Sequence, residues 1–256
     1  MTLHKLIAFD LDDTLAPSKS PLDERMSVQL RRLLDVADVC VISGGQIAQF
    51  QAQVIDRLET ASPDQLSRLH LMPTCGTQYY RYEGDSWQRK YAQELSPEVR
   101  EHAIKVVEET ARELGYWESD TWGPIMEDRG SQVTFSALGQ AAPVAAKQEW
   151  DPTGAKKNAL RDAVQDLLPE LEVRSGGSTS IDITKRGIDK AYGMERLAEV
   201  TGFGLDDMLF VGDRLDEHGN DYPVKRLGVQ CIAVTKWEDT LEVIDELIER
   251  VEVAGD

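Results

Sequence analysis

The feature that most constrains how this chain folds is a recurring short apolar run that ends in a polar side chain. Runs of this length, bounded by turn residues, are typical of buried strands. In an open parallel sheet, ligands bind outside the carboxyl ends of the strands, so these polar groups are expected to meet in one crevice. The runs are LIAFDL (6–11) with Asp10, VCVIS (39–43) with Ser43, and MLFVGD (208–213) with Asp213.

Helical patterns separate these runs along the chain. Strands that alternate with helices predict a parallel sheet covered on both faces, which is a Rossmann-like α/β core. CIAV (231–234) is a further expected strand. The expected helices run from about Leu22 to Leu34, from Gly44-Gly45 to about Leu58, from about Gly187 to Val200, and from about Glu238 onwards.

The middle of the chain has a different pattern. Alternating strand-like stretches lie between helical ones, which is typical of antiparallel sheets packed on helices. We therefore expect an α+β cap domain inserted at residues 81–185 into a core formed by residues 1–80 and 186–256. The expected helices lie near residues 97–114 and 153–168, and the expected strands are SQVTFSALG (131–139), LEVRS (171–175) and STSIDIT (178–184).

The charge of the chain excludes several classes of partner. Its formal net charge is −18, whereas nucleic acids and anionic membranes are bound by basic surfaces. We expect neither a membrane span nor a secretion signal, because no apolar stretch is long enough and the N-terminal run ends in acids. Three widely spaced cysteines, Cys40, Cys75 and Cys231, favour buried thiols in a reducing cytoplasm.

The residues at the strand ends suit phosphoryl transfer. A carboxylate such as Asp10 can attack phosphorus, and a second carboxylate two residues on, Asp12, can protonate the leaving group. Attack by an anion on an anionic group needs positive charge, which Mg²⁺ held by oxygen ligands and Lys190 would supply. Asp213 would complete the metal site, and Ser43 would donate a hydrogen bond to a phosphoryl oxygen.

Each of these residues alone also has a structural interpretation. An acidic residue after a strand is most often a turn or helix-capping residue. Ser43 with the two glycines that follow it could form a tight turn, and Lys190 could be solvated on its helix. The groups taken together, in this order, are much harder to explain as turns, so we favour a catalytic site.

In this order the residues resemble the four-motif signature of the haloacid-dehalogenase superfamily, namely DLDDT (10–14), Ser43, Lys190 and Gly212-Asp213. The resemblance implies that Asp10 is transiently phosphorylated and that Asp12 is the general acid and base. It also implies that Mg²⁺ is bound by Asp10, the backbone carbonyl of Asp12, and Asp213. We assign Asp221, in the acidic stretch that follows, to the outer shell of the same metal site.

The large insert is similar to the α/β cap of the sugar-phosphatase branch of that superfamily, subfamily IIB. The match is closer still to the eukaryotic-type phosphomannomutases. These carry a cap arginine followed by a strand that ends in glycine, a GG-x-x-S-x-D stretch before the catalytic lysine, and a long loop after the metal aspartate. The matching segments are EDRGSQVTFSALG (127–139), SGGSTSIDITKRGIDK (175–190), GDRLDEHGNDYPV (212–224) and TKWEDT (235–240).

The same resemblance assigns substrate contacts to side chains of the cap. Arg129 matches a cap arginine that holds the substrate's non-transferring phosphate. Ser180 and Asp182 match the serine and aspartate that contact substrate in the family. Lys19 and Lys147 stand where the family has arginine, and we include them in the substrate-binding set.

Departures from the family weaken this phosphate clamp. Gln140 stands where the family has another arginine, in addition to Lys19 and Lys147. Arginine forms a bidentate fork on phosphate, whereas lysine is a point charge and glutamine is uncharged. Ser43 resembles the phosphatases of the branch, since the mutases have an apolar residue before the paired glycines. Gly44, the first of that pair, is assigned to substrate binding.

We therefore predict a Mg²⁺-dependent phosphatase that hydrolyses small phosphorylated metabolites, with hexose phosphates as the favoured substrates. The first alternative is a phosphomannomutase that interconverts mannose 1-phosphate and mannose 6-phosphate, which the long spacing between Asp213 and Asp221 favours. The second is a non-catalytic regulatory protein on the same fold. Family mutases dimerise through the cap, so the resemblance also implies a cap-mediated homodimer.

Overall fold

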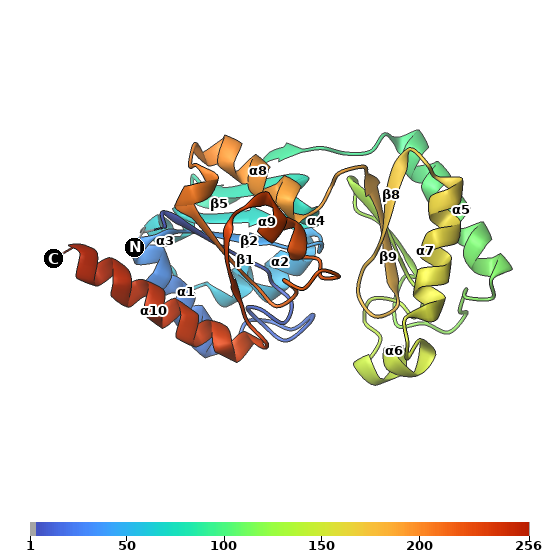
Figure 1. Ribbon diagram of the computed structural model, residues 1–256, viewed down its shortest axis with the longest axis horizontal. Coiled ribbons are helices and arrows are strands. Elements are labelled where there is room, and N and C mark those ends of the chain that lie inside the picture. Colours follow the sequence, from blue (N-terminus) through green and yellow to red (C-terminus); the bar gives the residue numbers. More distant parts are fainter. Residues whose placement is uncertain (1–3, 256) are drawn as a thin grey trace. The chain divides into compact units, whose positions relative to one another are not determined.

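The computed structural model describes residues 4–255, which divide into two compact units (Figure 1). We call Gln93–Ile188 the inserted unit, and the described residues on either side of it the core unit. Each unit has its own sheet and its own apolar cluster, as expected of separately packed domains. Of the helices within residues 4–255, none combines the length and the apolar content that a membrane span requires.

The core unit is built on one mainly parallel sheet. β1 lies inside it and pairs in parallel with β2 on one side and β10 on the other. This sheet and its helices confirm the predicted α/β fold class. The strands are, in spatial order, β11 (Gln230–Ala233), β10 (Met208–Gly212), β1 (Leu6–Phe9), β2 (Asp38–Ile42), β3 (Leu69–Met72), β4 (Gln78–Glu83) and β5 (Ser86–Ala92).

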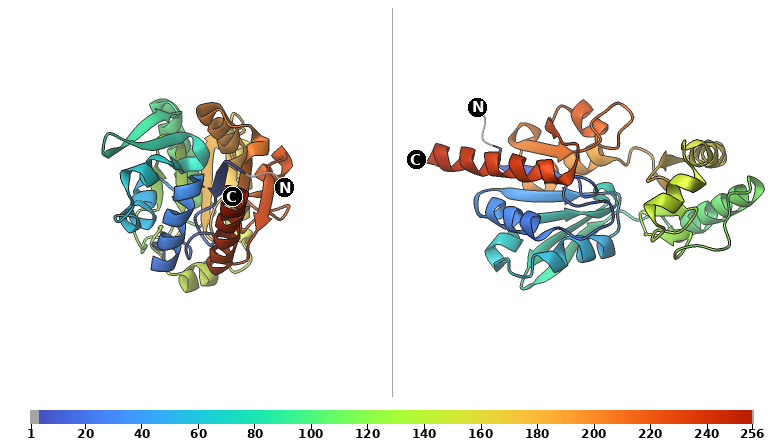
Figure 2. Two further views of the ribbon diagram at one scale, coloured as in Figure 1. Left: turned by 90° about the vertical axis from the view of Figure 1, so that its left-hand side faces the viewer. Right: turned by 90° about the horizontal axis from the view of Figure 1, so that it is seen from below.

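Successive residues of the parallel strands pack on opposite faces of this sheet. Ile7 and Phe9 belong to the apolar cluster beneath α1 and α10, which run side by side (Figure 2), whereas Leu6 and Ala8 belong to the cluster beneath α8. Both faces are therefore covered. The helices of this unit are α1 (Glu24–Val36), α2 (Ile47–Gln53), α3 (Pro63–Ser67), α4 (Pro73–Gly76), α8 (Lys190–Thr201), α9 (Tyr222–Leu227) and α10 (Trp237–Gly255), with 3-10 turns at Ile55–Arg57 and Leu205–Asp207.

The sequence of α1 explains why this segment forms a helix. Asp23 caps the N-terminus by accepting a hydrogen bond from the backbone N–H of Arg25. Met26, Leu30 and Leu33 recur at helical spacing and are buried. Burial stabilises by about 1.5–3 kcal/mol for each large apolar side chain, so this stripe holds the helix on the sheet.

The inserted unit is an antiparallel sheet packed on helices. Val133, Phe135 and Ile181 face the apolar cluster that α5 and α7 cover. Because side chains alternate along a strand, polar residues lie on the opposite face. The name "polar face" is used below for these residues, which are Gln132, Thr134, Ser136, Ser180 and Asp182. The strands are, in spatial order, β6 (Met126–Asp128), β7 (Gln132–Ser136), β9 (Ser180–Lys185) and β8 (Leu171–Ser175), and the helices are α5 (Pro97–Glu113), α6 (Val144–Trp150) and α7 (Ala155–Leu167).

One segment lies in a different unit from the one that the sequence indicates. The sequence pattern places residues 81–92 in the insert, but they form most of the β4–β5 hairpin at the edge of the core sheet. The hairpin turns at Gly84 and Asp85, both with positive φ, and pairs with β3 through His70 and Arg81. It continues the core sheet in the antiparallel direction, so the insert begins after it.

Candidate active site

Predicted site residues follow neighbouring strands of the core sheet. Asp10 comes directly after β1, Ser43 after β2 and Asp213 after β10, and these strands are adjacent. Because the strands are parallel, their carboxyl ends lie at the same edge of the sheet. The backbone N–H of Asp10 still donates to the carbonyl of Val211 at 3.0 Å, which fixes the register there. The structure thus brings these residues to one edge.

Lys190 joins the strand-end residues from a helix. It is the first residue of α8, which Asp189 caps by accepting a hydrogen bond from the backbone N–H of Tyr192 at 3.0 Å. The lysine side chain is buried, and its Nζ lies 2.6 Å from Oδ1 of Asp10 and 2.5 Å from Oδ1 of Asp221. Two buried carboxylates therefore share this ammonium group.

Asp10, Asp213 and Asp221 form what we call the acidic cluster. One carboxylate oxygen from each lies within 4.8 Å of the others. When all are ionised, three carboxylates and one lysine leave an excess of two negative charges, which a divalent cation would balance. Oxygen donors of this kind are the ligands that Mg²⁺ prefers. The residues present therefore fit a hard divalent cation.

The pKa values of the cluster reflect this excess of negative charge. Burial raises the pKa of Asp10 to about 8, with Lys190 opposing the rise and Asp221 adding to it. Burial, followed by repulsion from Asp221, also raises the pKa of Asp213. Burial would lower the pKa of Lys190, but the Asp10 and Asp221 carboxylates raise it above its usual value. The lysine is therefore charged, and the carboxyl groups compete for it.

Asp12 lies in the loop after β1 and is held by several donors. Oδ1 accepts hydrogen bonds from the backbone N–H of Lys19 at 2.7 Å and from Gln53 at 3.3 Å. Oδ2 accepts from Nζ of Lys19 at 2.9 Å and from Gln49 at 3.2 Å. Burial raises the pKa of Asp12, but the charge and hydrogen bonds of Lys19 outweigh burial and lower the pKa below its usual value. Asp12 is therefore a carboxylate here, the form that accepts a proton.

Gln49 and Gln53 are not among the residues that the sequence predicts for the site. They lie four residues apart on α2, so they face the same side of that helix. The signal that would find them is a pair of amides one helical turn apart, directly after Ser43 and its two glycines. These neutral side chains are connected to the active site by the hydrogen bonds that they donate to Asp12.

Ser43 is held by hydrogen bonds within the loop that follows β2. Its Oγ accepts from the backbone N–H of Gly45 at 3.2 Å, and its carbonyl accepts from the backbone N–H of Cys75 at 2.9 Å. A Cβ added at Gly45 would lie 2.3 Å from Oε1 of Gln49, whereas one at Gly44 would lie 4.0 Å from Sγ of Cys75. A side chain at Gly45 would thus displace the amide of Gln49, whereas one at Gly44 would not.

Two predicted substrate residues of the insert lie on the polar face. Oδ1 of Asp182 accepts hydrogen bonds from Gln132 at 2.8 Å and from Thr134 at 2.7 Å. The hydroxyl groups of Ser180 and Ser136 share a hydrogen bond of 2.9 Å. Gln132 and Thr134 were not predicted, and they hold Asp182 in place as a hydrogen-bond acceptor.

The remaining predicted residues of the insert have partners inside it. Arg129 forms an ion pair of 2.5 Å with Glu127, and both side chains are largely buried. Nζ of Lys147 donates to the carbonyl of Gln140 at 3.1 Å. The side-chain amide of Gln140 in turn donates to Ser136 at 2.7 Å. The charge of Arg129 is therefore matched within the insert.

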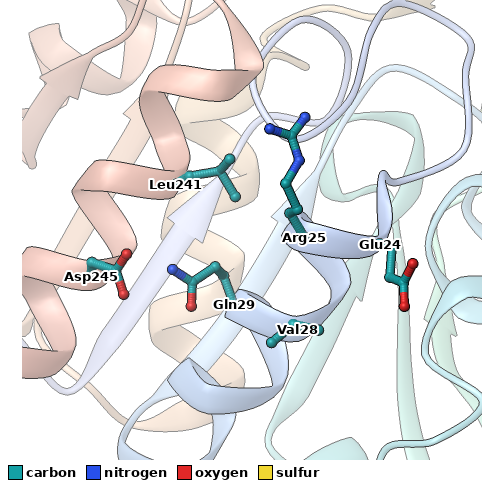
Figure 3. A pocket seen from close by; sticks show the side chains of 6 residues that line it. All are labelled: Glu24, Arg25, Val28, Gln29, Leu241 and Asp245. Carbon is teal, nitrogen blue, oxygen red and sulfur yellow. The ribbon is translucent and has the colours of Figure 1, made fainter.

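A groove on the core unit does not coincide with this chemistry. It lies between α1 and α10 (Figure 3), on one face of the sheet rather than at the strand ends. Its charged side chains have mixed sign, and no predicted site residue lines it. The lining residues are Glu24, Arg25, Val28, Gln29, Leu241 and Asp245.

Comparison with known sequences relates most of the chain to one family. A sequence model of the family described as eukaryotic phosphomannomutase matches residues 26–250. The phosphomannomutase of Encephalitozoon cuniculi is 23% identical over 258 residues, which cover 98% of this chain and 96% of that protein. The similarity thus extends through both units.

Solved structures share the fold at lower identity. The IMP-bound IMP-nucleotidase of Plasmodium falciparum aligns with a TM-score of 0.71 and 11% identity, over 96% of this chain and 68% of that one. A haloacid dehalogenase-like hydrolase from Bacteroides thetaiotaomicron aligns with a TM-score of 0.61 and 17% identity, over 95% of this chain and 99% of that one. At these identities the structures establish the fold alone.

Proposed function

This chain belongs to the eukaryotic phosphomannomutase family, as the resemblance of its sequence predicted. Within that family, we propose that it is a Mg²⁺-dependent phosphatase that acts through a phosphorylated Asp10. The observation that carries the proposal is the contact of buried Asp10 with Lys190 inside the acidic cluster, with ionised Asp12 two residues on. A nucleophile, a cation and a base are what phosphoryl transfer requires. The proposed substrates are small phosphorylated metabolites, foremost hexose phosphates.

In the proposed first step, the phosphoryl group moves from the sugar to Asp10. An oxygen of Asp10 bonds to phosphorus while the bond from phosphorus to the sugar oxygen breaks, and the leaving oxygen takes a proton from Asp12. Lys190 compensates the charge, and Ser43 donates a hydrogen bond to a phosphoryl oxygen. Asp12 is ionised while Lys19 contacts it. We therefore propose that Lys19 turns to the substrate phosphate, so that Asp12 can first take up the proton that it delivers.

The acidic cluster is the proposed magnesium site. Asp10, Asp213 and the backbone carbonyl of Asp12 would hold Mg²⁺, and Asp221 would support it from its buried position. When bound, the ion supplies positive charge that stabilises the phosphoryl group during transfer. Oδ2 of Asp221 accepts a hydrogen bond from the backbone N–H of Arg214 at 3.0 Å, which fixes its orientation.

In the proposed second step, water removes the phosphoryl group. Asp12 takes a proton from water, the water oxygen bonds to phosphorus, and the bond from phosphorus to Asp10 breaks. The lowered pKa of Asp12 supports this role, because the ionised group is ready to accept a proton. Inorganic phosphate is the product.

The side chains that would hold a second phosphate, Lys19 in the core unit and Lys147 and Gln140 in the insert, favour water over a sugar as the acceptor. A mutase has to bind a phosphate at either end of a bisphosphorylated sugar. Lysine at Lys19 and Lys147 and an amide at Gln140 cannot form the bidentate fork of arginine on a second phosphate. Arg129 has that fork, but Glu127 pairs with it. A weaker hold on a second phosphate would let the sugar leave after the first step.

The second candidate function is that of a phosphomannomutase. Family membership supports it, as does the long, acidic loop that carries Asp213 at its start and the buried Asp221 near its end. In this reaction the phosphoryl group on Asp10 would pass back to a sugar hydroxyl, with Asp12 removing the hydroxyl proton. The two candidates share the core chemistry and differ in the acceptor.

A time course distinguishes the two candidates. Mannose 6-phosphate and Mg²⁺ are incubated with the enzyme, with and without glucose 1,6-bisphosphate, and free phosphate and hexose 1-phosphate are followed together. We expect free phosphate without dependence on the bisphosphate. Bisphosphate-dependent hexose 1-phosphate with little free phosphate would establish the mutase instead. If neither appears, a broad panel of phosphorylated metabolites follows, and no phosphate release from any of them would refute the phosphatase.

We also propose how the protein assembles and where it is located. The family resemblance supports a homodimer formed through the insert, which light scattering after size-exclusion chromatography would detect. The wide spacing of the cysteines Cys40, Cys75 and Cys231 in the sequence supports a reducing cytoplasm as the location.

A further inference from the structure

α2 presents two amide side chains to a single carboxylate. Nε2 of Gln49 lies 3.2 Å from Oδ2 of Asp12, and Nε2 of Gln53 lies 3.3 Å from Oδ1. The two glutamines are four residues apart, so a single helix face carries both donors. The carboxylate is therefore held at both oxygens by one rigid element, independently of the loop that carries it.

Gln53 occupies this position with one of its polar atoms unsatisfied. The side chain is 3% exposed, and Nε2 also donates to the carbonyl of Ser20 at 2.7 Å. Since both neighbours of Nε2 are acceptors, the amide cannot be turned over. Within residues 4–255, Oε1 of Gln53 has no hydrogen-bond partner. A buried acceptor without a donor is destabilising, so the two bonds that Nε2 donates are what this amide contributes at its position.

Gln49 connects the same carboxylate to the partly exposed ammonium group of Lys19. Its Oε1 accepts a hydrogen bond from Nζ of Lys19 at 3.1 Å, and this oxygen lies where a Cβ at Gly45 would be. The side chain of Lys19 is 42% exposed, whereas Gln53 is buried. The donors around Asp12 thus include the solvent-accessible ammonium group of Lys19, which can leave, and the buried amide of Gln53, which stays.

We propose that Gln53, assisted by Gln49, is a positioning residue that holds the Asp12 carboxyl group in place for proton transfer when Lys19 has turned to the substrate. The inference rests on the proposed function, because it assumes that Asp12 exchanges protons with the leaving group and with water. It differs from a packing role in one consequence. Loss of the amide should slow a reaction step that needs a proton from Asp12, and should not slow a step that needs none.

The test is Gln53→Met, which keeps the length of the side chain and removes both polar atoms. With Mg²⁺, we expect kcat for a hexose phosphate to fall about 10- to 100-fold, with KM changed less than about twofold. Nitrophenolate is a good leaving group that needs no proton. The initial burst of nitrophenolate from p-nitrophenyl phosphate, which reports transfer to Asp10 alone, should therefore keep its rate.

Matched variants separate positioning from packing. Gln51→Met is the control, because Gln51 lies on the same helix, is exposed and contacts Asp56. Gln51→Met should leave the rates with both substrates unchanged. Gln49→Met should show the same selectivity as Gln53→Met to a lesser degree, and it replaces that variant if Gln53→Met fails to fold. Asp12→Asn sets the largest loss to be expected. The melting temperature of Gln53→Met is measured to establish that the variant is folded.

The outcomes distinguish the inference from the function on which it rests. A wild type inactive on every phosphate ester refutes the proposed function and this inference with it. An active wild type, with Gln53→Met unchanged or with both substrates slowed equally, refutes the inference alone. Selective loss on the hexose phosphate, with the nitrophenolate burst preserved, supports it.

Discussion

In the acidic cluster of the core unit, two carboxylates contact Lys190 and a third lies close by, whereas in the inserted unit Arg129 and Arg174 each contact a separate carboxylate. Arg129 contacts Glu127, and the guanidinium of Arg174 lies 3.1 Å from Glu172. Asp182 of the polar face accepts hydrogen bonds from neutral donors. The two sheets thus differ in how they hold charge, although both are built from the same alternation of apolar and polar residues.

The difference indicates how the work is divided between the units. An excess of buried negative charge is stable only with a cation, so the core unit is suited to bind one and to use it in chemistry. Arg129 and Arg174 of the insert have ionic partners inside it, and its polar face offers hydrogen bonds. A surface of this kind is suited to recognise sugar hydroxyl groups rather than a second phosphate. Metal dependence should therefore lie in the core and substrate preference in the insert.

The largest expected effect removes the nucleophile from the core. Asp10→Asn should lower phosphate release by about 10⁴-fold or more, because no carboxylate remains to accept the phosphoryl group. The melting temperature should stay the same or rise, since one buried carboxylate leaves the acidic cluster. Activity is measured with the best substrate, and folding by circular dichroism. Retained activity would contradict the proposed mechanism, whereas its loss in a folded variant excludes a non-catalytic regulatory protein.

Removal of the metal tests whether the acidic cluster is incomplete by itself. Mg²⁺ at 100 times its dissociation constant should stabilise the folded core by about 2.7 kcal/mol, seen as a rise in melting temperature over the protein in EDTA. Asp213→Asn should lose most of this rise, because the cluster then has one carboxylate fewer. Glu127→Gln, in the insert, is the control and should keep it. An equal rise in Asp213→Asn would place the metal elsewhere.

The pH dependence of the metal-free protein should come from the same cluster. The pKa of Asp10 is raised from 3.8 to about 8 in the folded protein, so between these values the folded state binds a proton that the unfolded state does not. Stability in EDTA should therefore fall as the pH rises from about 4 to about 8. Denaturant titrations at several pH values measure this slope. In Asp10→Asn the slope should be smaller, and an unchanged slope would assign it to other groups.

The smallest expected effect breaks a pair in the insert. Glu127→Gln should weaken the pairing of Arg129, leave its fork more available to phosphate, and lower KM for a hexose bisphosphate by about two- to fivefold. kcat for a hexose monophosphate should stay within about twofold, because the core chemistry is untouched. Steady-state kinetics with both substrates measures the change. A large fall in kcat would mean that the two units are not as independent as their charges suggest.

Much of the core architecture follows from the sequence because its signals are local. Apolar runs at Leu6–Phe9 and Met208–Gly212 predict buried strands, and α1 has both a cap and a regular apolar stripe. The β4–β5 hairpin was not recognised as part of the core. Its residues are a mixture of aromatic and charged ones, and pairing with β3, together with packing of Tyr80 and Trp87 on the core cluster, assigns it to that sheet. Such pairing depends on distant segments, which no local pattern encodes.

The positions of the site residues divide in the same way. Asp10, Ser43 and Asp213 are brought together because each follows a parallel strand, a rule that can be applied to the sequence alone. The roles of Gln49 and Gln53 depend on how the loop after β1 folds back against α2. A glutamine has no reactivity that would attract notice in a sequence. Its function arises from the neighbour that it happens to hold.

The capped start of α8 has a consequence for how such proteins can be redesigned. The second connection between the units ends at Ile188, and Asp189 then caps the helix that begins with Lys190. Lys190, the second residue after Ile188, is thus anchored by its own helix. A foreign domain could be grafted between Ala92 and Asp189 without moving the charge of Lys190, so the core could serve as a scaffold for inserts of other specificity.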